Sequence, residues 1–427
     1  MSDQTLLQRR FRVLGRHSPL FYEKPLQLVR GEGVWVYDAD GKRYLDAYNN
    51  VPHVGHCHPR VVDALCKQAR TLNSHTRYLD ATVVDYAEKL LSTFQPSLQR
   101  VFFTCTGSES NELALRIARE CTGHMGVIST DFAYHGNTAA VAQISSVFTP
   151  AQKRGPHVRC VPSIDPYRER NGRGDEELTN AYIRDLQGAI DDFSRNGVKL
   201  AAVLFCTAFS SEGLPQVPRG YFAKVAEVTR AAGGLVIADE VQAGFGRFGS
   251  HMWGHDLHGM LPDIVTMGKP MGNGHPLAGV VTTAELMERF TSQNMYFNTF
   301  GGNEVSAAAG MAVLNVLQED RLLENAQVVG DYVISGMRKL QEKHQIIGDV
   351  RGKGMFFGVE MVTERRTREP ATARTKAIIN AMRERGVLIS RIGPKDNILK
   401  IRPPMCFSRD NADLLLSTLD SVLTSLS

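Results

Sequence analysis

Between about residues 100 and 285, short apolar runs alternate with longer stretches whose apolar residues recur at helical spacing. The runs are apolar at most positions rather than at every second one, and they cover residues 101–104, 126–130, 200–205, 234–240, 263–268 and 278–283. Strands of this kind are typical of a sheet covered on both faces, because both faces then need apolar side chains. The helical stretches between them favour mostly parallel strands. The pattern therefore predicts a large α/β domain.

The remaining segments predict a smaller α+β domain. They are a hairpin at 33–47, a glycine-interrupted strand pair at 347–361, a helix at 375–386, a strand at 397–405 and a closing helix at 409–425. At 427 residues the chain is too long for one small core, so two domains are expected. We assign residues 1–55 to an N-terminal segment that joins the small domain, 56–315 to the large domain and 316–427 to the C-terminal small domain.

Composition narrows the class of protein. Hydrophobic residues make up 43% and charged residues 22% of the chain, as in ordinary soluble globular proteins. No apolar run is long enough for a membrane span, and the N-terminal residues lack the apolar segment of a secretory signal. We therefore expect a cytoplasmic protein with no membrane partner. The net charge of +4 is spread along the chain, which argues against nucleic acid as a partner.

The cysteine and histidine patterns do not indicate a metal site. The seven cysteines are scattered and never spaced C-x-x-C, which indicates reduced thiols rather than disulfides or a zinc ribbon. His53, His56, Cys57 and His58 lie close together, but no second ligand pair follows at zinc-like spacing. We expect no metal, and we expect this loop to line the entrance of an active site.

Lys269 is a candidate catalytic residue. In "DIVTMGKPMGNGHP" (263–276) a strand-like run leads directly into Lys269, with Gly268, Gly272 and Gly274 around it. The lysine is either a solvated turn residue, with glycines that supply left-handed backbone angles, or a nucleophile that forms a Schiff base with a carbonyl compound. This stretch alone leaves both readings open.

Three other strand ends favour the second reading. Pyridoxal 5'-phosphate, the commonest protein-bound aldehyde, also needs an anion site, a carboxylate for its ring nitrogen and a partner for its ring face. Gly107 and Ser108 begin a helix directly after a strand, which suits a phosphate. Asp239 ends an apolar strand, and Tyr134 with His135 follows another. Each signal is weak alone, but together they indicate a pyridoxal-phosphate site.

Five motifs resemble the class III aminotransferases, which are fold-type-I pyridoxal-phosphate enzymes. The resemblance runs from about residue 28 to the C-terminus, and its motifs are "TGSESNELALRIAR", "YHGNT", "IADEVQAGFGRFG", "PDIVTMGKPMGNGHPLAGVVTT" and "NTFGGNEVSAAAG".

The resemblance implies a role for each matching residue. It implies that Lys269 is the Schiff-base lysine and proton shuttle, that Asp239 pairs with the ring nitrogen, and that Gln242 lies near the phenolic oxygen. Gly107 and Ser108 would hold the phosphate, and Tyr134, next to His135, would cover the ring. Thr299 would reach the phosphate bound by the neighbouring subunit, so a homodimer with shared active sites is expected.

Two positions depart from the common aminotransferase pattern. Members that bind an α-carboxylate usually carry arginine where this chain has Lys400, three residues before Pro403. The usual Glu-Pro after the middle strand is replaced by Cys206 and Thr207. Because arginine grips a carboxylate with two parallel bonds and lysine does not, a standard α-carboxylate clamp is not supported.

Four further segments, at 48–62, 73–80, 370–390 and 399–408, look like the ethanolamine-phosphate phospho-lyase branch. That branch eliminates a leaving group and releases an aldehyde and ammonia. The resemblance implies a small amine substrate with a phosphate or phosphonate head, with Arg77, Lys400 and Arg402 as donors and Asn50 as a pocket residue.

The leaving group stays open at this stage. Phosphate would leave from O-phosphoethanolamine, whereas hydroxide would leave from 2-amino-1-hydroxyethylphosphonate. The alternatives from other classes are an omega-aminotransferase, in which Arg402 substitutes for the missing arginine, and a non-catalytic binding protein. The presence of Lys269, Asp239, Gln242 and Thr299 argues against the last of these.

Overall fold

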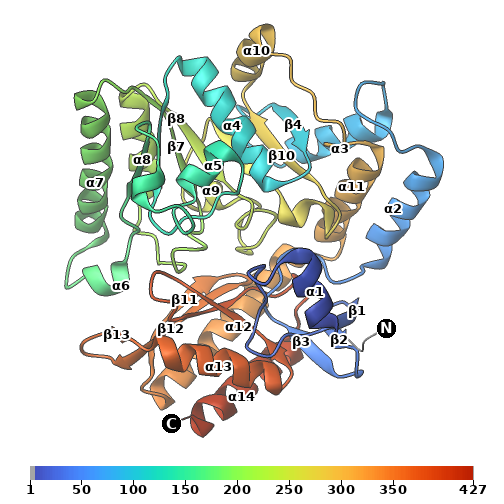
Figure 1. The fold of residues 1–427 in the computed structure, drawn as a ribbon, viewed down its shortest axis with the longest axis vertical. Coiled ribbons are helices and arrows are strands. Elements are labelled where there is room, and N and C mark those ends of the chain that lie inside the picture. Colours follow the sequence, from blue (N-terminus) through green and yellow to red (C-terminus); the bar gives the residue numbers. More distant parts are fainter. Residues whose placement is uncertain (1–4, 427) are drawn as a thin grey trace.

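The computed structural model describes residues 5–426 and is built around a seven-stranded sheet (Figure 1). The strand order is β4-β10-β9-β8-β7-β5-β6. Every strand runs parallel to the others except β10, which is antiparallel to both of its neighbours. The strands are β4 (Arg100–Thr104), β5 (Gly126–Thr130), β6 (Val158–Val161), β7 (Leu200–Cys206), β8 (Leu235–Asp239), β9 (Ile264–Met267) and β10 (Ala278–Thr282). The predicted α/β class is therefore confirmed.

Helices cover both faces of this sheet, as its apolar strands require. The helices of this part of the chain are α2 (Pro59–Thr71), α3 (Ala81–Leu91), α4 (Gly107–Thr122), α5 (Ala139–Ile144), α6 (Pro166–Glu169), α7 (Asp175–Arg195), α8 (Tyr221–Ala231), α9 (Gly254–Leu257), α10 (Ala284–Gln293) and α11 (Glu304–Glu319), and among them α4, α5, α7 and α8 pack directly on the strands. Short 3-10 turns occur at η1 (Ala151–Lys153) and η2 (Lys269–Gly272).

Helix α4 shows how the sequence sets these elements. The Thr106 side chain caps its first turn by accepting from the amide of Glu109, and Gly123 ends it in a left-handed conformation. Leu113 and Ile117 lie on its buried face against the sheet. Each such side chain stabilises the fold by roughly 1.5–3 kcal/mol through burial. The same cap fixes where the first turn of α4 stands relative to β4.

Strand β6 was not among the predicted strands. It lies at the edge of the sheet and pairs only with β5. Two of its residues, Arg159 and Cys160, are half-buried rather than buried. Arg159 interrupts the apolar run, so this four-residue strand lacks the continuous apolar pattern from which the other strands were predicted.

Two smaller sheets form the lower part of the molecule in Figure 1. One has the order β1-β2-β3-β14, and the other has the order β11-β12-β16-β15, with β13 paired to β12. Their strands are β1 (Leu28–Glu32), β2 (Trp35–Asp38), β3 (Arg43–Asp46), β11 (Ile347–Lys353), β12 (Phe356–Glu364), β13 (Glu369–Pro370), β14 (Val387–Leu388), β15 (Ser390–Ile392) and β16 (Ile398–Ile401). Helices α12 (Leu322–Lys343), α13 (Thr372–Glu384) and α14 (Arg409–Ser425) pack on them.

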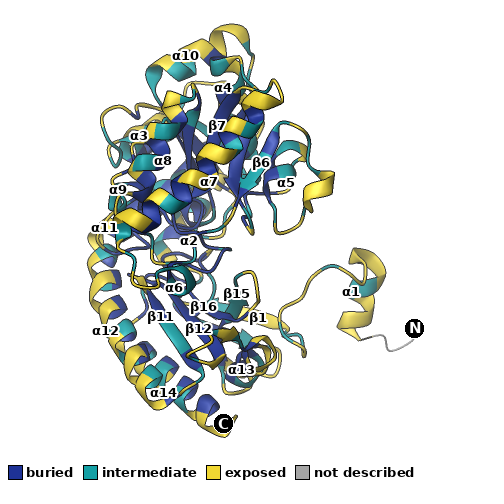
Figure 2. Cartoon of the chain, turned by 90° about the vertical axis from the view of Figure 1, so that its left-hand side faces the viewer, coloured by how far each residue is buried: buried dark blue, intermediate teal, exposed yellow. Residues whose placement is uncertain are grey.

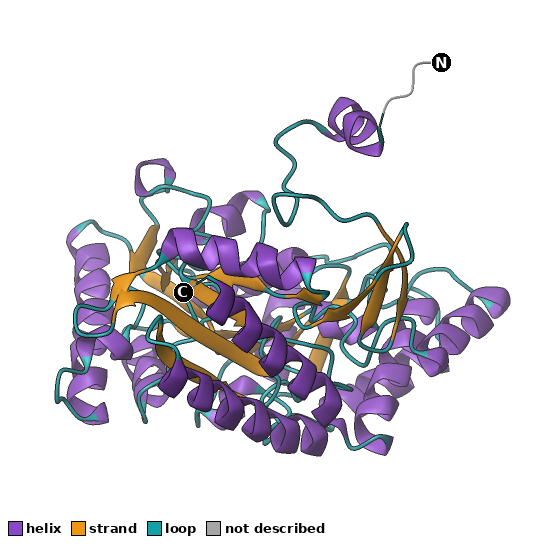
Figure 3. Ribbon diagram, turned by 90° about the horizontal axis from the view of Figure 1, so that it is seen from below, coloured by secondary structure: helices purple, strands orange, loops and turns teal. Residues whose placement is uncertain are grey.

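The N-terminal hairpin reaches the C-terminal chain through a parallel pairing. Strand β3 pairs with β14, with Leu45 opposite Val387. Helix α1 (Leu6–Leu14) stands away from the rest of the chain, and none of its residues is buried (Figures 2 and 3). The domain boundaries near residues 55 and 315 stay predictions, and residues 1–4 of the first segment lie outside the described residues. No helix in residues 5–426 has the length and apolar character needed to cross a bilayer.

Candidate active site

The carboxyl ends of the central parallel strands meet at a cavity of about 190 Å³. Each of these strands points the same way, so the residues that follow them gather at one edge of the sheet. The cavity is lined by Thr106, Gly107, Ser108, Tyr134, His135, Gly136, Cys206, Asp239, Val241, Gln242 and Lys269. The structure therefore brings together the residues that the sequence analysis proposed for the cofactor, apart from Thr299.

Lys269 begins η2 directly after β9, with a positive φ of 28°. A non-glycine residue in such a conformation is strained and needs surrounding structure to hold it. Burial, followed by the positive charge of Arg402, lowers the pKa of Lys269 to about 8. The lysine is therefore closer to its neutral, nucleophilic form at neutral pH than an exposed lysine.

Glycine is required at Gly268 and at Gly274 for different reasons. A Cβ on Gly268 would stand 3.2 Å from the amide nitrogen of Gly107, so this glycine allows the end of β9 to approach the start of α4. Gly274 has a φ of +106°, which only glycine adopts readily. The close backbone contact at Gly268 is therefore one with the first turn of α4.

Asp239 is buried and fixed by three donors. His135 Nδ1 lies 2.7 Å from its Oδ2, Asn111 Nδ2 lies 3.1 Å from the same oxygen, and the amide of Val241 lies 3.0 Å from Oδ1. Asn111 is itself oriented by Thr266, whose hydroxyl donates to Asn111 Oδ1 over 2.7 Å. These bonds hold the carboxylate at one position at the end of β8, in line with what a ring nitrogen would need.

The first turn of α4 forms the opposite wall. Gly107 and Ser108 occupy its first positions, where helical hydrogen bonding leaves N–H groups free and the helix dipole favours an anion. A Cβ on Gly136 would stand 2.6 Å from Ser108 Oγ, so this position admits only a glycine. The Ser108 hydroxyl also accepts from the amide of Asn137 over 3.3 Å. This bond connects the first turn of α4 to the segment that follows Tyr134.

A wider cavity of about 470 Å³ adjoins the first one. Tyr134, Gln242 and Lys269 line both cavities. Tyr134 packs edge-on against Phe148, with ring centroids 5.4 Å apart. The remaining lining residues are Tyr48, Phe132, Val147, Ser211, Arg391, Ile392, Gly393, Pro394, Asp396, Lys400 and Arg402. The wider cavity is therefore placed to hold a substrate whose reacting end points at Lys269.

Lys400 and Arg402 converge on Gln242. Both donate to its side-chain oxygen, Lys400 over 3.4 Å. Lys400 also donates to the carbonyl of Ser210 over 2.7 Å, and Arg402 Nε donates to the carbonyl of Tyr48 over 2.9 Å. Because lysine and arginine only donate, the amide oxygen of Gln242 must face them. Within residues 5–426 no hydrogen bond from the amide nitrogen of Gln242 is found.

The cavity has a positive electrostatic character. Burial, and then the charges of Arg402 and Lys269, lower the pKa of Lys400 well below its usual range. Burial raises the pKa of Glu212, whose Oε1 accepts from Thr130 over 2.6 Å. Glu212 lies in the loop after β7, so this loop supplies a buried carboxyl group although positions 206 and 207 lack one. A dianion entering beside Lys400 and Arg402 would replace the missing counter-charge.

The structure does not bring every proposed residue to this site. Arg77 is exposed, with its guanidinium 4.2 Å from the ring centroid of Phe297, and it lines neither cavity. Thr299 is also exposed on this chain. Asn50 is buried, and within residues 5–426 neither polar atom of its side chain has a hydrogen-bond partner. The roles proposed for these three residues stay predictions.

The side chains of His53 and His56, in the histidine-rich loop, form hydrogen bonds with other residues of the fold. His53 is held between the carbonyl of Phe245 at 2.7 Å and Arg247 Nη2 at 2.8 Å, and His56 pairs with Asp46 at 2.7 Å. No group of His, Cys, Asp and Glu side chains with metal-binding geometry occurs within residues 5–426.

Sequence reasoning missed several lining residues. Cys206 was noted only as a departure, and Tyr48, Phe148 and Arg391 were not considered. Tyr48 follows β3 and Arg391 lies in β15, so the fold brings them to the cavity from distant segments. Only the position of Cys206 at a strand end carried a local signal.

Comparison with known proteins supports this arrangement. The family model for class-III aminotransferases matches residues 21–423. A solved phospholyase from Arthrobacter in complex with phosphoethanolamine is 51% identical, covers 99% of this chain and 100% of its own, and superposes with a TM-score of 0.96. The Caenorhabditis elegans protein named ethanolamine-phosphate phospho-lyase homolog 1 is 40% identical over 99% of this chain and 94% of its own.

A more distant solved structure shows the cofactor of the wider family. It is an amine transaminase from an uncultivated Pseudomonas species in a form with pyridoxal phosphate bound. It is 29% identical, covers 95% of this chain and 96% of its own, and has a TM-score of 0.86. The fold-type-I architecture expected from the sequence is therefore confirmed, and this chain belongs to the class-III aminotransferase family.

Proposed function

We propose that this chain is a pyridoxal-phosphate-dependent lyase that eliminates a leaving group from a small phosphorylated or phosphonated amine and releases an aldehyde and ammonia. The observation that supports this most is the pair of buried basic side chains, Lys400 and Arg402, in the cavity beside Lys269. A dianionic phosphate or phosphonate head needs several donors rather than one planar fork. The 51% identity to a phospholyase solved with phosphoethanolamine favours the same reaction class.

The residues of the smaller cavity fit pyridoxal phosphate. Lys269 would hold its aldehyde carbon, Asp239 would pair with the ring nitrogen, and Tyr134 would lie against the ring. Gly107 and Ser108 would bind the phosphate at the first turn of α4. The carboxylate of Asp239, already held by His135 and Asn111, suits a protonated ring nitrogen. When bound, the cofactor withdraws electrons from the carbon that bears the amino group.

Residues of the chain would accept the proton and bind the anionic head. Lys269 Nζ, with a pKa of about 8, accepts the proton from the carbon that bears the amino group. The bond from the neighbouring carbon to the leaving group breaks, and hydrolysis of the product gives an aldehyde and ammonia. Lys400 and Arg402 hold the anionic head of the bound substrate, and the side-chain oxygen of Gln242 keeps the two basic side chains in position. With O-phosphoethanolamine the anionic head itself departs, whereas with 2-amino-1-hydroxyethylphosphonate hydroxide departs and the head stays.

An omega-aminotransferase is the second candidate. It would move the amino group of an amine or amino acid to a keto acid, which requires a carboxylate site in the same cavity. Arg402 supplies one guanidinium there, and the transaminase that is 29% identical shares the fold. Lys400 in place of the family's arginine weighs against this reading, because an ammonium cannot bind a carboxylate with two parallel bonds.

The deciding experiment uses the purified protein with pyridoxal phosphate and no keto acid. O-phosphoethanolamine and 2-amino-1-hydroxyethylphosphonate are offered separately, and ammonia, aldehyde and inorganic phosphate are measured. Ammonia with phosphate identifies a phospho-lyase, and ammonia without phosphate from the phosphonate identifies an ammonia-lyase. Turnover that starts only after pyruvate or 2-oxoglutarate is added contradicts the proposal and identifies an aminotransferase.

Substitution of Lys269 tests whether the activity depends on this site. Lys269→Ala should abolish turnover, with a loss of at least about a thousandfold, because the nucleophile and the proton acceptor are then both absent. Lys339→Ala, an exposed lysine on α12, is the matched control and should keep full activity. Normal activity in Lys269→Ala would show that another residue carries the chemistry.

A further inference from the structure

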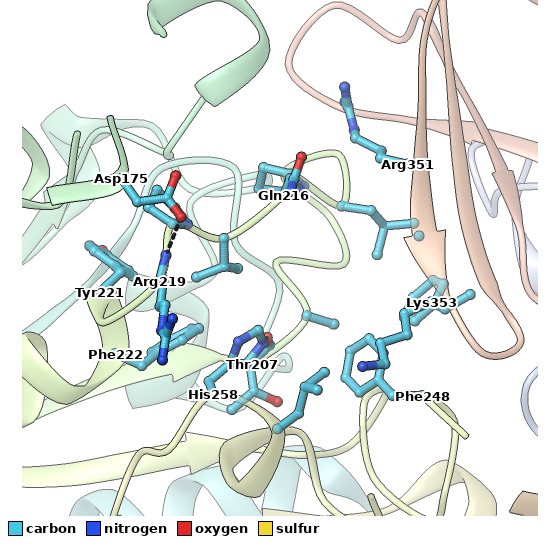
Figure 4. A pocket seen from close by; sticks show the side chains of 18 of the residues that line it. Asp175, Thr207, Gln216, Arg219, Tyr221, Phe222, Phe248, His258, Arg351 and Lys353 are labelled. Atoms are coloured by element: carbon cyan, nitrogen blue, oxygen red, sulfur yellow. Dashed lines mark hydrogen bonds between the residues drawn. The ribbon is translucent and has the colours of Figure 1, made fainter. Parts of the chain in front are cut away.

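A third cavity, of about 480 Å³, lies where the large-sheet part of the chain meets strand β11 (Figure 4). Its walls include Thr207, the segment 214–222, His258 beyond α9, and Lys353 at the end of β11. Within the described chain, it has no lining residue in common with either active-site cavity. Its volume falls in the range of small-molecule sites, and such sites favour the junction between two parts of a fold.

Part of the wall of this cavity is apolar and aromatic. Phe222 and Phe248 lie on either side of His258, with ring centroids 5.0 and 6.3 Å from the imidazole. Phe356 and Leu214 are buried and add further apolar surface. Burial lowers the pKa of His258 to about 4, so its ring is neutral at pH 7. An occupant therefore needs an apolar body to match these walls.

The rim of the cavity is basic. Arg219, Arg338 and Lys353 have exposed side chains, and none of them forms an ion pair with a residue of the described chain. Figure 4 shows the side chains of Arg219 and Lys353 on opposite walls.

The remaining charges of the lining are already engaged. Asp175 is the single carboxylate among the lining residues described, and it accepts from Arg170 Nη2 over 2.7 Å and from the amide of Arg219 over 3.0 Å. Arg351 is paired with Asp349 and Glu360 at 2.9 and 2.7 Å. Arg219 shares the Asp175 carboxylate with Arg170, and Arg338 and Lys353 form no ion pair within residues 5–426. The rim therefore keeps a net positive charge, which attracts an anion.

We propose that this cavity is a binding site for a small organic anion with an apolar body, of the alkyl or aryl carboxylate or phosphate-ester class. The apolar walls would take the body, and Arg219, Arg338 and Lys353 would take the anionic group. Neither feature alone defines a site, but their combination selects amphiphilic anions over inorganic ions and over neutral apolar molecules.

The wall of this cavity is bonded to the active site. His258 Nε2 donates to the carbonyl of Thr207 over 3.0 Å, and the amide of Thr207 lies 3.4 Å from the carbonyl of Asp239. Thr207 follows Cys206, which lines the smaller cavity. A ligand that packs on Thr207 and His258 therefore reduces the motion of the segment after β7.

The test is calorimetric titration of the protein saturated with pyridoxal phosphate. The probes are 4-phenylbutyrate, phenyl phosphate, inorganic phosphate and 4-phenylbutanol. We expect 4-phenylbutyrate to bind at one site per chain, and 4-phenylbutanol and inorganic phosphate to bind at least about tenfold more weakly, because each lacks one half of the match. Phenyl phosphate should also bind this cavity, and any phenyl phosphate binding that survives the variant below belongs to the active site.

The triple variant Arg219→Gln/Arg338→Gln/Lys353→Gln removes the rim charges at exposed positions. It should weaken 4-phenylbutyrate binding by about tenfold or more while turnover stays normal. Lys339→Gln, next to Arg338 but outside the lining, should change neither. Amide hydrogen exchange across residues 207–222 should slow with the probe in wild type and not in the triple variant. Absence of binding up to about 10 mM, or equal binding by the triple variant, overturns the proposal.

Discussion

His135 Nδ1 lies 2.7 Å from Asp239 Oδ2, and both side chains are buried. The other ring nitrogen, Nε2, lies 3.1 Å from the Ser129 hydroxyl at the end of β5. Since β5 and β8 are separated by β7 in the sheet, His135 links two strand ends that are not neighbours. The histidine is therefore a positioning residue that fixes the carboxylate of Asp239 from the side of β5.

Replacing His135 with phenylalanine should destabilise the protein. Asp239 Oδ2 would keep only Asn111 as a side-chain donor, and a buried carboxylate that loses a bond costs about 1–3 kcal/mol. Urea unfolding of wild type and His135→Phe measures the change in the free energy of unfolding. His124→Phe is the matched control, because within residues 5–426 the His124 side chain bonds to the carbonyl of Leu200 and to no carboxylate. Equal loss in the two variants would mean that the pairing with Asp239 contributes little.

Replacing Lys400 with methionine should lower activity without lowering stability. Loss of the ammonium removes a donor to the anionic head, so kcat/KM for the phosphorylated or phosphonated amine should fall by about 10- to 100-fold. Burial of the Lys400 ammonium costs free energy, and its bonds go to the Ser210 carbonyl and the Gln242 amide instead of a carboxylate. The free energy of unfolding should therefore stay equal or increase.

The same variant separates the two candidate functions. If kcat/KM for the anionic amine is unchanged and activity with a keto acid rises, Lys400 does not serve the anionic head. Lys339→Met controls for the general effect of losing a lysine, since Lys339 is exposed on α12.

The lowered pKa of Lys269 predicts a pH-dependent stability for the cofactor-free protein. In the unfolded chain this lysine titrates near 10.5, and in the folded chain near 8. Between these values the unfolded state binds more protons, so the free energy of unfolding rises with pH. Lys269→Met lacks this term and should be more stable than wild type at about pH 7, with a smaller difference at about pH 9.5. Urea unfolding at both values measures it, and a difference that is constant or grows with pH contradicts the shift.

The sequence predicted the cofactor side of the site better than the substrate side. Gly107, Asp239 and Lys269 each lie at or within three residues of the end of an apolar strand, and parallel strands bring such residues to one edge of the sheet. Their convergence in one cavity follows from local patterns and from the direction of the strands.

The substrate side depends on contacts between distant segments. Gln242 accepts from Lys400 and Arg402, which lie about 160 residues further along the chain, and Glu212 was hidden in a loop without periodicity. Strand β6 was not predicted because Arg159 interrupts its short apolar run. Arg77 and Thr299 are exposed on this chain. The structure of a single chain does not show whether an exposed residue contributes to the active site of a neighbouring subunit.

Thr299 provides a test of shared active sites. If Thr299 serves the phosphate bound by the neighbouring subunit, each site combines Lys269 of one chain with Thr299 of the other. Thr299→Asp places a negative charge beside a phosphate and should lower activity by about tenfold or more. The substitution is on an exposed side chain, so the chain itself should fold normally.

Mixing Thr299→Asp with Lys269→Ala should then restore activity that neither variant has alone. In a hybrid dimer, one site joins the intact Lys269 of the first chain to the intact Thr299 of the second, and the other site carries both defects. Random exchange of subunits makes half of the dimers hybrid, so the mixture should recover about a quarter of wild-type activity. Ammonia release after subunit exchange measures this recovery. If Lys269 and Thr299 instead act within one chain, every site in the mixture keeps one defect and activity stays at the mean of the two variants.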